Sequence, residues 1–235
     1  MNRAKGDRTR AQIIEGALRA LSATGVLGVT TRRIAAESGV QLATLHYHFD
    51  SKSSLLLAVL DSMIDEMKRE RRDEVKTSKD LDDCIQQVLH STWSWIMRTR
   101  VLQIVQYELT LYALREGANW LAERQYDAYV QIYDDLLRRA PNGDDELADD
   151  ERKAVAHFML AGIDGLILQE LAKPNRARSK RCVDALILAT QGYVRSLKER
   201  RARVAPPRRS PRRAAPAAAG RGEAPAPEVD SPEGA

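Results

Sequence analysis

The stretch Thr30–Lys52 holds the side chains of this chain that are best suited to contacting nucleic acid. Its second half is short and polar, and beyond Val40, Leu45 and Phe49 it offers little apolar area for a core. Amide, hydroxyl and small apolar side chains can read base edges in the major groove, whereas cations and aromatic hydroxyls contact phosphates. We expect base contacts from Gln41, Leu42, Ala43 and Thr44, with His46 as a further candidate, and phosphate contacts from Thr31, Arg32, Tyr47 and Lys52.

Two short helices joined by a tight turn must position these side chains. Thr30, or Thr31 one place later, can cap the first helix through its hydroxyl. Gly39 stands where a sharp turn between helices requires a positive φ. The second helix is expected at about residues 41–47. This pattern predicts a helix-turn-helix whose second helix enters the major groove of DNA.

Lys52 is expected in the first turn of the next helix, which Asp50 or Ser51 can cap. A cation at that end of a helix opposes the macrodipole and costs roughly 0.3–1 kcal/mol. A phosphate would reverse the sign, because Lys52 and the free amides of that turn would converge on one anion. The alternative is a solvated lysine that tolerates its position.

Two motifs, TTRRIAAESGV and TLHYHFDSKSSLL, follow an amphipathic helix that ends at Gly25. Together they resemble the TetR (tetracycline-repressor) family of bacterial transcriptional regulators over about residues 8–60. The family commonly has two aromatic residues before the His-Phe pair, and here His46 replaces the first, which leaves Tyr47. The resemblance implies a homodimer that binds a palindromic double-stranded DNA operator and is released by a small-molecule effector. It favours a repressor, although the sequence leaves activation open.

The composition is that of a soluble globular protein, with 43% hydrophobic and 30% charged residues among 235. The net charge of +4 is unevenly distributed: residues 1–52 carry +4, residues 53–201 carry −2 and residues 202–235 carry +2. The excess of cations coincides with the predicted helix-turn-helix, as phosphate binding requires. The N-terminus lacks an apolar signal segment, and Asp164 interrupts the longest apolar stretch, 158–168. We expect a cytoplasmic protein without a membrane span.

The chain divides into three predicted parts. Residues 1–52 are expected to form the DNA-binding domain, 53–201 a helical ligand-binding and dimerisation domain, and 202–235 a disordered tail rich in Pro, Ala and Arg. No segment with β-type alternation competes, so the predicted class is all-α. Helices are expected at 7–24, 52–76, 81–98, 102–115, 118–140, 151–172 and 179–201.

Aromatic and polar residues are frequent in the middle helices, which suits a cavity for an aromatic or amphipathic small molecule. Tyrosines at helical spacing are also common at the edges of an ordinary core. No residue spacing indicates a metal or a cofactor, and Cys84 and Cys182 are expected to be ordinary thiols, a redox pair being the alternative. The candidate pocket residues are Trp93, Gln103, Tyr107, Tyr126, Tyr129 and His157.

The last two helices are apolar on more than one side, so one side can face the core and another a partner. A two-fold four-helix bundle between two copies is the economical arrangement, and the alternative is a wide core within one chain. The candidate dimer contacts are Ile163, Leu166, Ile167, Leu186, Ile187, Tyr193 and Val194.

Two other classes of function remain as alternatives. One is a DNA-binding regulator or architectural protein with no small-molecule ligand. The other is a helical enzyme using Glu108 and His157 as an acid–base pair. We expect no catalytic residue, because the chain has no nucleophile motif or phosphate loop.

Overall fold

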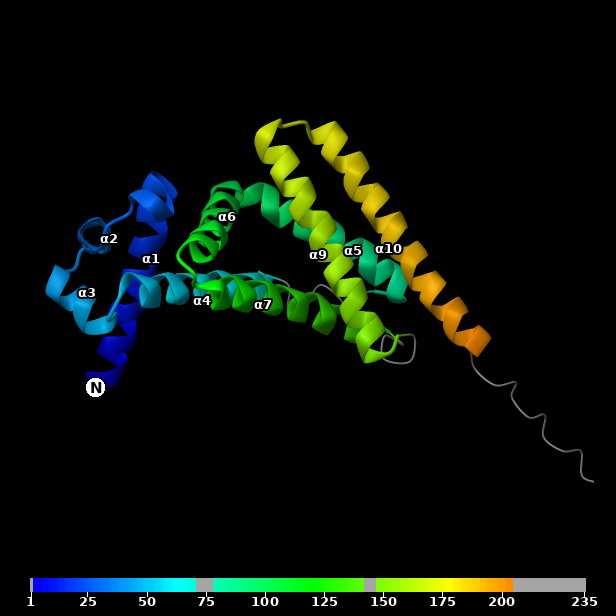
Figure 1. Cartoon of the computed structure of the whole chain (residues 1–235), viewed down its shortest axis with the longest axis horizontal. Helices are drawn as coiled ribbons and strands as arrows, with labels where there is room; N and C mark the ends of the chain where they lie inside the picture. The colour runs from blue at the N-terminus through cyan, green and yellow to red at the C-terminus, as the bar shows by residue number, and fades with distance from the viewer. Residues whose placement is uncertain (1, 71–77, 142–146, 205–235) are drawn as a thin grey trace, which may run out of the picture.

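The computed structural model describes residues 2–70, 78–141 and 147–204, and every regular element within them is a helix (Figure 1). The predicted all-α class, with an N-terminal helix-turn-helix followed by a larger helical part, is confirmed. The N-terminal helices are α1 (Asn2–Gly28), α2 (Thr31–Ser38), α3 (Leu42–His48) and α4 (Lys52–Glu70). The remaining helices are α5 (Leu81–Arg98), α6 (Arg100–Arg115), α7 (Asn119–Arg138), α9 (Asp149–Ala172) and α10 (Arg176–Val204).

Local sequence signals produce the helix-turn-helix as predicted. The Thr30 hydroxyl accepts a hydrogen bond from the Arg33 amide at 3.2 Å and caps α2. Gly39 ends α2 in the left-handed region, with φ 64°, and its amide bonds back to carbonyls of the last turn. Ser51 and Ser54 cap α4 reciprocally, each accepting from the other's amide at 3.0–3.2 Å.

Gly25 interrupts α1, as its sequence context predicts, but the helix does not stop there. Its φ of 71° and ψ of 170° kink the chain, and one further turn continues to Gly28. The N-terminus of α1 lies at Asn2, five residues before the predicted start at Asp7. The kink turns the end of α1 toward α6, with which α1 is in contact (Figure 1).

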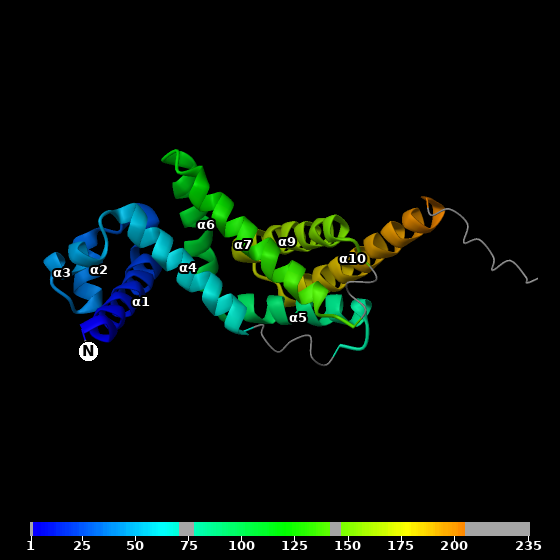
Figure 2. The same cartoon turned by 90° about the horizontal axis from the view of Figure 1, so that it is seen from below.

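Two hydrophobic clusters hold the helices together. The N-terminal cluster joins α1, α2 and α3 to the first half of α4 and includes Val105 and Leu109 of α6. The larger cluster joins the second half of α4, from Leu60 onward, to α5, α7, α9 and α10. Helix α4 therefore belongs to both clusters and connects the recognition helix to the larger helical part (Figure 2).

Helix α9 is the single described helix that is long and apolar enough to pass a test for a membrane span. Its residues Val155, Met159, Ile163 and Ile167 are buried against the larger cluster, as expected of a core helix in a globular protein. The apolar composition of α9 is therefore explained by its packing against the larger cluster.

Predicted and observed boundaries agree within a few residues for the later helices. Helix α10 runs to Val204, so residues 202–204 of the predicted tail are helical. Residues 205–235, the end of the predicted helix 52–76 and the turn after Pro141 lie outside the described residues. The division of the chain at residue 52 stays a prediction, because the first half of α4 packs with the N-terminal helices.

Candidate nucleic-acid interface and internal cavity

Helix α3 presents a polar face to solvent. Leu45 is buried and anchors the helix, whereas Gln41, Ala43 and His46 are exposed and Thr44 is half-buried. Tyr47 is 85% exposed, which is unusual for an aromatic side chain and leaves its whole ring available to a partner. These side chains have the accessibility that contact with bases and phosphates requires.

Two of the predicted contact residues are less accessible than the others. Leu42 is half-buried and packs against the N-terminal cluster. Only the exposed part of its side chain could make the predicted base contact. Thr31 is half-buried beside the exposed Arg32. The neighbouring guanidinium of Arg33 pairs with Glu37 at 2.7 Å, which leaves Arg32 as the unpaired cation of the two.

Lys52 does not match either sequence-based interpretation. Its ammonium donates to the Val26 carbonyl at 3.0 Å and lies 5.4 Å from the centre of the Tyr112 ring. The carbonyl at the kink of α1 is thereby satisfied by a cation from α4. A phosphate contact by Lys52 stays a prediction, and one of the remaining N–H groups of the ammonium would have to make it.

A surface groove beside Tyr47 was not predicted from the sequence. It is lined by Lys5, Gly6, Asp7, Thr9 and Arg10 of α1 together with Tyr47 and His48, so two cations and one acid face it. The Arg10 guanidinium stacks 5.1 Å from the Phe49 ring centre, which holds a cation next to the recognition helix. A positively charged N-terminal segment was visible in the sequence, but only the packing of α1 brings it beside α3.

The end of α1 is also bound to α6. The Glu108 carboxylate accepts a hydrogen bond from the Val26 amide at 2.8 Å, directly after Gly25. Glu108 thus has a structural partner, and His157 is exposed on α9, so the structure does not bring together the pair considered for an enzyme. Glu108 and Lys52 together hold the junction between α1, α4 and α6. Glu108 accepts from the amide of Val26, and Lys52 donates to the carbonyl of the same residue.

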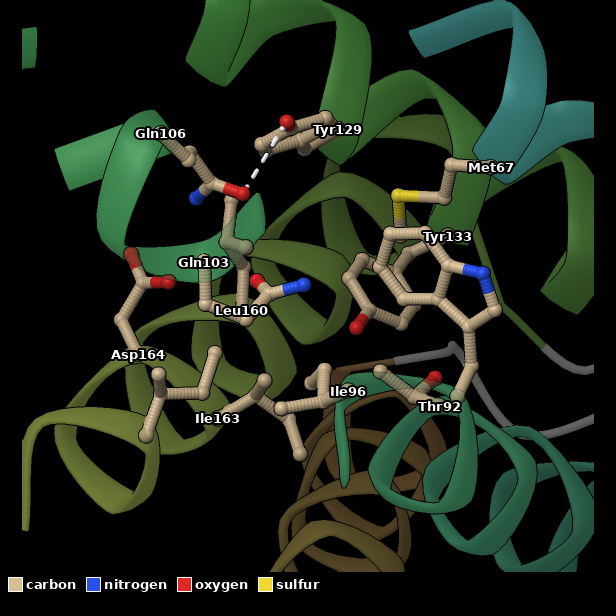
Figure 3. Close-up of a pocket in the computed structure, with 12 residues that line it drawn as sticks. Met67, Thr92, Ile96, Gln103, Gln106, Tyr129, Tyr133, Leu160, Ile163 and Asp164 are labelled. Carbon is tan, nitrogen blue, oxygen red and sulfur yellow. Dashed lines mark hydrogen bonds between the residues drawn. The ribbon is translucent and has the colours of Figure 1, made fainter. Parts of the chain in front are cut away.

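An internal cavity lies between α4, α5, α6, α7 and α9 (Figure 3). Gln103 and Tyr129, two of the predicted pocket residues, line it. The free space is only about 20 Å³, room for about one water molecule, so a larger occupant must displace side chains. The complete lining is Met67, Thr92, Trp95, Ile96, Gln103, Gln106, Tyr129, Tyr133, Leu160, Ile163, Asp164 and Ile167.

Two predicted pocket residues lie elsewhere. Trp93 packs at the edge of the larger cluster, and Trp95 lines the cavity instead, because helical residues two positions apart point about 200° apart. His157 is exposed on the outer face of α9. Neither residue lines this cavity, because composition indicates an aromatic helix without indicating which of its faces turns inward.

Asp164 is the charged residue of the cavity lining, and it is not among the pocket residues predicted from the sequence. The Tyr107 hydroxyl donates to its backbone carbonyl at 3.0 Å and approaches its carboxylate at 3.4 Å, and Tyr126 hydrogen-bonds the same carboxylate. Burial raises the pKa of Asp164 to about 6, although both tyrosine hydrogen bonds oppose the rise. The predicted residues Tyr107 and Tyr126 therefore contact the cavity through Asp164. An acid inside an apolar helix was the sequence signal that could have found it.

The structure corrects part of the predicted dimer surface. Ile163, Ile167, Ile187 and Val194 are buried inside the chain, whereas Leu166, Leu186 and Tyr193 are half-buried. The exposed apolar stripe on α9 and α10 consists of other residues, and Phe158 of this stripe contacts Tyr193 across the two helices. The stripe consists of Phe158, Ala161, Leu168, Ala185, Leu188 and Ala189.

Comparison with known proteins agrees with this geometry. Residues 13–59, which span the helix-turn-helix, match the family model described as bacterial regulatory proteins, tetR family. The nicotine-responsive transcriptional repressor HdnoR of Paenarthrobacter nicotinovorans is 26% identical over 76% of this chain and 91% of its own length. The transcriptional regulator TtgR of Pseudomonas putida is 27% identical over 73% of this chain and 84% of its own.

Solved structures share the fold at low identity. A TetR-family regulator from Cytophaga hutchinsonii superposes with a TM-score of 0.65 at 18% identity, covering 80% of this chain and 96% of the other. The multidrug binding protein EbrR, complexed with imidazole, gives 0.56 at 24% identity, with coverages of 75% and 92%.

The fold and the exposed face of α3 define a helix-turn-helix DNA-binding regulator. The family model matches residues 13–59, and relatives that span most of the chain are 26–27% identical, so the chain is similar to TetR-family transcriptional regulators.

Proposed function

We propose that this regulator acts as a homodimer on a palindromic operator and is released when a small molecule enters the internal cavity. The observation that carries the proposal is the polar, exposed face of α3 beside the cationic groove of α1. Two such faces in a two-fold dimer would enter successive major grooves roughly 34 Å apart. Repression is the sense suggested by the relative HdnoR, which is a transcriptional repressor. A protein that acts on such an operator would work in the cytoplasm, which is the localisation we propose.

The proposed operator contacts follow from accessibility. Gln41, Thr44 and His46 would hydrogen-bond to base edges, and Ala43 would contact a thymine methyl group. Arg32, Tyr47 and the groove residues Lys5 and Arg10 would contact phosphates. Fluorescence anisotropy on DNA flanking its own gene, with excess non-specific competitor, tests the proposal. Binding that competitor or modest salt abolishes would contradict sequence-specific recognition.

The Tyr47→Ala variant is expected to bind the operator at least about fivefold more weakly, since one lost contact is worth about 1–3 kcal/mol. Its free energy of unfolding should change by less than about 0.5 kcal/mol, because the ring is 85% exposed. Trp120→Ala, which removes an exposed aromatic ring of α7, is the matched control. Equal operator affinities for the two variants would remove Tyr47 from the interface.

We assign the dimer surface to the exposed stripe of α9 and α10. Its alanines, with Gly165 and Gly192, allow two helix pairs to approach closely, and Leu168 and Leu188 would become buried between copies. Exposed apolar side chains clustered on one face commonly mark such an interface.

Leu188→Arg is expected to give a monomer in light scattering and to lose most operator affinity, because a charge would be buried at the two-fold interface. Leu114→Arg, on an equally apolar and exposed site of α6, should remain dimeric. A dimeric Leu188→Arg protein would place the interface elsewhere.

Release by a ligand is supported by the position of Met67. This α4 residue lines the cavity, and α4 begins four residues after the recognition helix. Because the cavity is nearly filled, a ligand would have to displace Met67 or its neighbours and so shift α4. A regulator without any ligand is the second candidate, and the closed state of the cavity is the observation that favours it.

A further inference from the structure

We propose that the cavity is built for a small organic cation, an amine or quaternary ammonium carrying an apolar or aromatic group, with Asp164 as its counter-ion. The proposal rests on the cavity being the effector site and adds the chemical class of the effector. It starts from the charge of the lining: Asp164 is the one ionised side chain among neutral amide, hydroxyl, aromatic and aliphatic groups.

Asp164 is half-buried and, unlike the fully buried acids Asp134 and Glu170 of the described residues, has no cation as a partner there. Asp134 is paired with Arg152 at 2.7 Å and with Arg138 at 3.0 Å. Glu170 has Arg178 at 3.9 Å. Within residues 2–70, 78–141 and 147–204, no lysine, arginine or histidine forms an ion pair with Asp164, whose side-chain partners are tyrosine hydroxyls. A carboxylate withdrawn from water without a cation is costly to the fold, and a bound cation would relieve that cost.

The remaining lining suits a cation with an apolar body. Figure 3 shows Asp164 with Gln106 and Gln103 on one side of the cavity and Met67 and Tyr133 on the other. Trp95, Tyr129 and Tyr133 supply aromatic rings, whose negative faces attract ammonium groups. A cationic head at Asp164 would therefore place its substituent among aromatic and aliphatic groups.

The lining also excludes other ligand classes. An anion would meet the carboxylate with no arginine or lysine to offset it, and a second charge on a dication would find no second acid in the lining. The free space of about 20 Å³ limits the occupant to a compact molecule that gains its room by moving flexible side chains such as Met67. A compact monocation meets these conditions.

The test uses three probes of similar size: phenyltrimethylammonium, its neutral isostere tert-butylbenzene, and benzoate. Binding to the full-length protein is followed by calorimetry and by tryptophan fluorescence, since Trp95 lines the cavity. We expect saturable binding of the cation at least about tenfold tighter than that of either other probe. Asp164→Asn, which preserves the shape and removes the charge, should abolish this preference and retain the neutral probe.

The pH profile supplies a second readout, because a quaternary ammonium does not titrate. Cation affinity should rise between about pH 5 and pH 7 as Asp164, with its pKa of about 6, becomes ionised. The titratable groups facing it are Tyr107 of α6 and Tyr126 and Tyr129 of α7, whose pKa values are raised by burial and which stay neutral over this range. The Asp164→Asn profile should be flat.

Equal binding of the cation and its isostere, no saturable binding of the cation at millimolar concentration, or an unchanged preference in Asp164→Asn would each overturn the cation proposal. Operator binding by wild type and Asp164→Asn is measured in parallel without probe. Loss of operator binding in both would count against the proposed function, whereas intact operator binding with no cation preference would count against the cation site alone.

Discussion

Asp134→Ala is expected to lower the free energy of unfolding by about 3–5 kcal/mol, the largest effect of any single substitution considered. Asp134 is fully buried on α7 and accepts from Arg152 Nε of α9 at 2.7 Å. Arg152 is only 1% exposed, so removal of the carboxylate leaves a guanidinium in the core without its buried counter-ion. Urea denaturation measures the loss directly.

The second carboxylate on the same arginine provides the control. Asp149 lies 2.6 Å from Arg152 Nη2, but its side chain is 84% exposed. Water screens that pair, so Asp149→Ala should destabilise the fold far less than Asp134→Ala does. If the two alanine variants were equally destabilised, burial would not be what gives the Asp134–Arg152 pair its importance. The two variants compare a buried and an exposed carboxylate that pair with the same guanidinium.

Gly16→Ala is expected to destabilise the N-terminal helices by about 1–3 kcal/mol or more and to weaken operator binding. A methyl group at Gly16 of α1 would lie 2.0 Å from Ser38 Oγ and 2.6 Å from Ser38 Cα of α2. Because one of these atoms is backbone, α1 and α2 must separate, and α3 follows α2 after a three-residue turn. The change therefore alters the placement of the recognition helix as well as the stability.

Gly6→Ala in the same helix is the matched control for stability alone, since nothing lies within 4 Å of the added methyl group but Gly6 lines the proposed DNA-binding groove. It should be neutral or slightly stabilising, as alanine favours helix more than glycine does. Adding Ser38→Ala to Gly16→Ala should not restore operator affinity, because the clash with Ser38 Cα persists. Full rescue by that second change would show that only the hydroxyl had limited the approach of the helices.

Features decided by residues near in sequence could be predicted, whereas contacts between residues distant in sequence could not. The Thr30 cap and the left-handed Gly39 were predicted correctly, because a cap or a positive φ is decided within three or four residues. The bounds of α5 were predicted to the residue for the same reason, with Asp80 as its cap. The contacts of Lys52 and Glu108 were not predicted, because both side chains bind the backbone of Val26, which lies 26 and 82 residues away in sequence.

The sequence by itself determined the helical class, the helix-turn-helix and its polar face, because periodicity and caps are local properties of the chain. Only the tertiary structure decided which apolar stripe of α9 and α10 turns inward, since Ile163 and Leu168 are similar in hydropathy and differ only in the neighbours they meet. It also decided that Trp95 and Asp164 face the cavity while Trp93 and His157 do not. The phase of a helix is set by packing against elements distant in sequence, and local propensity carries no information about it.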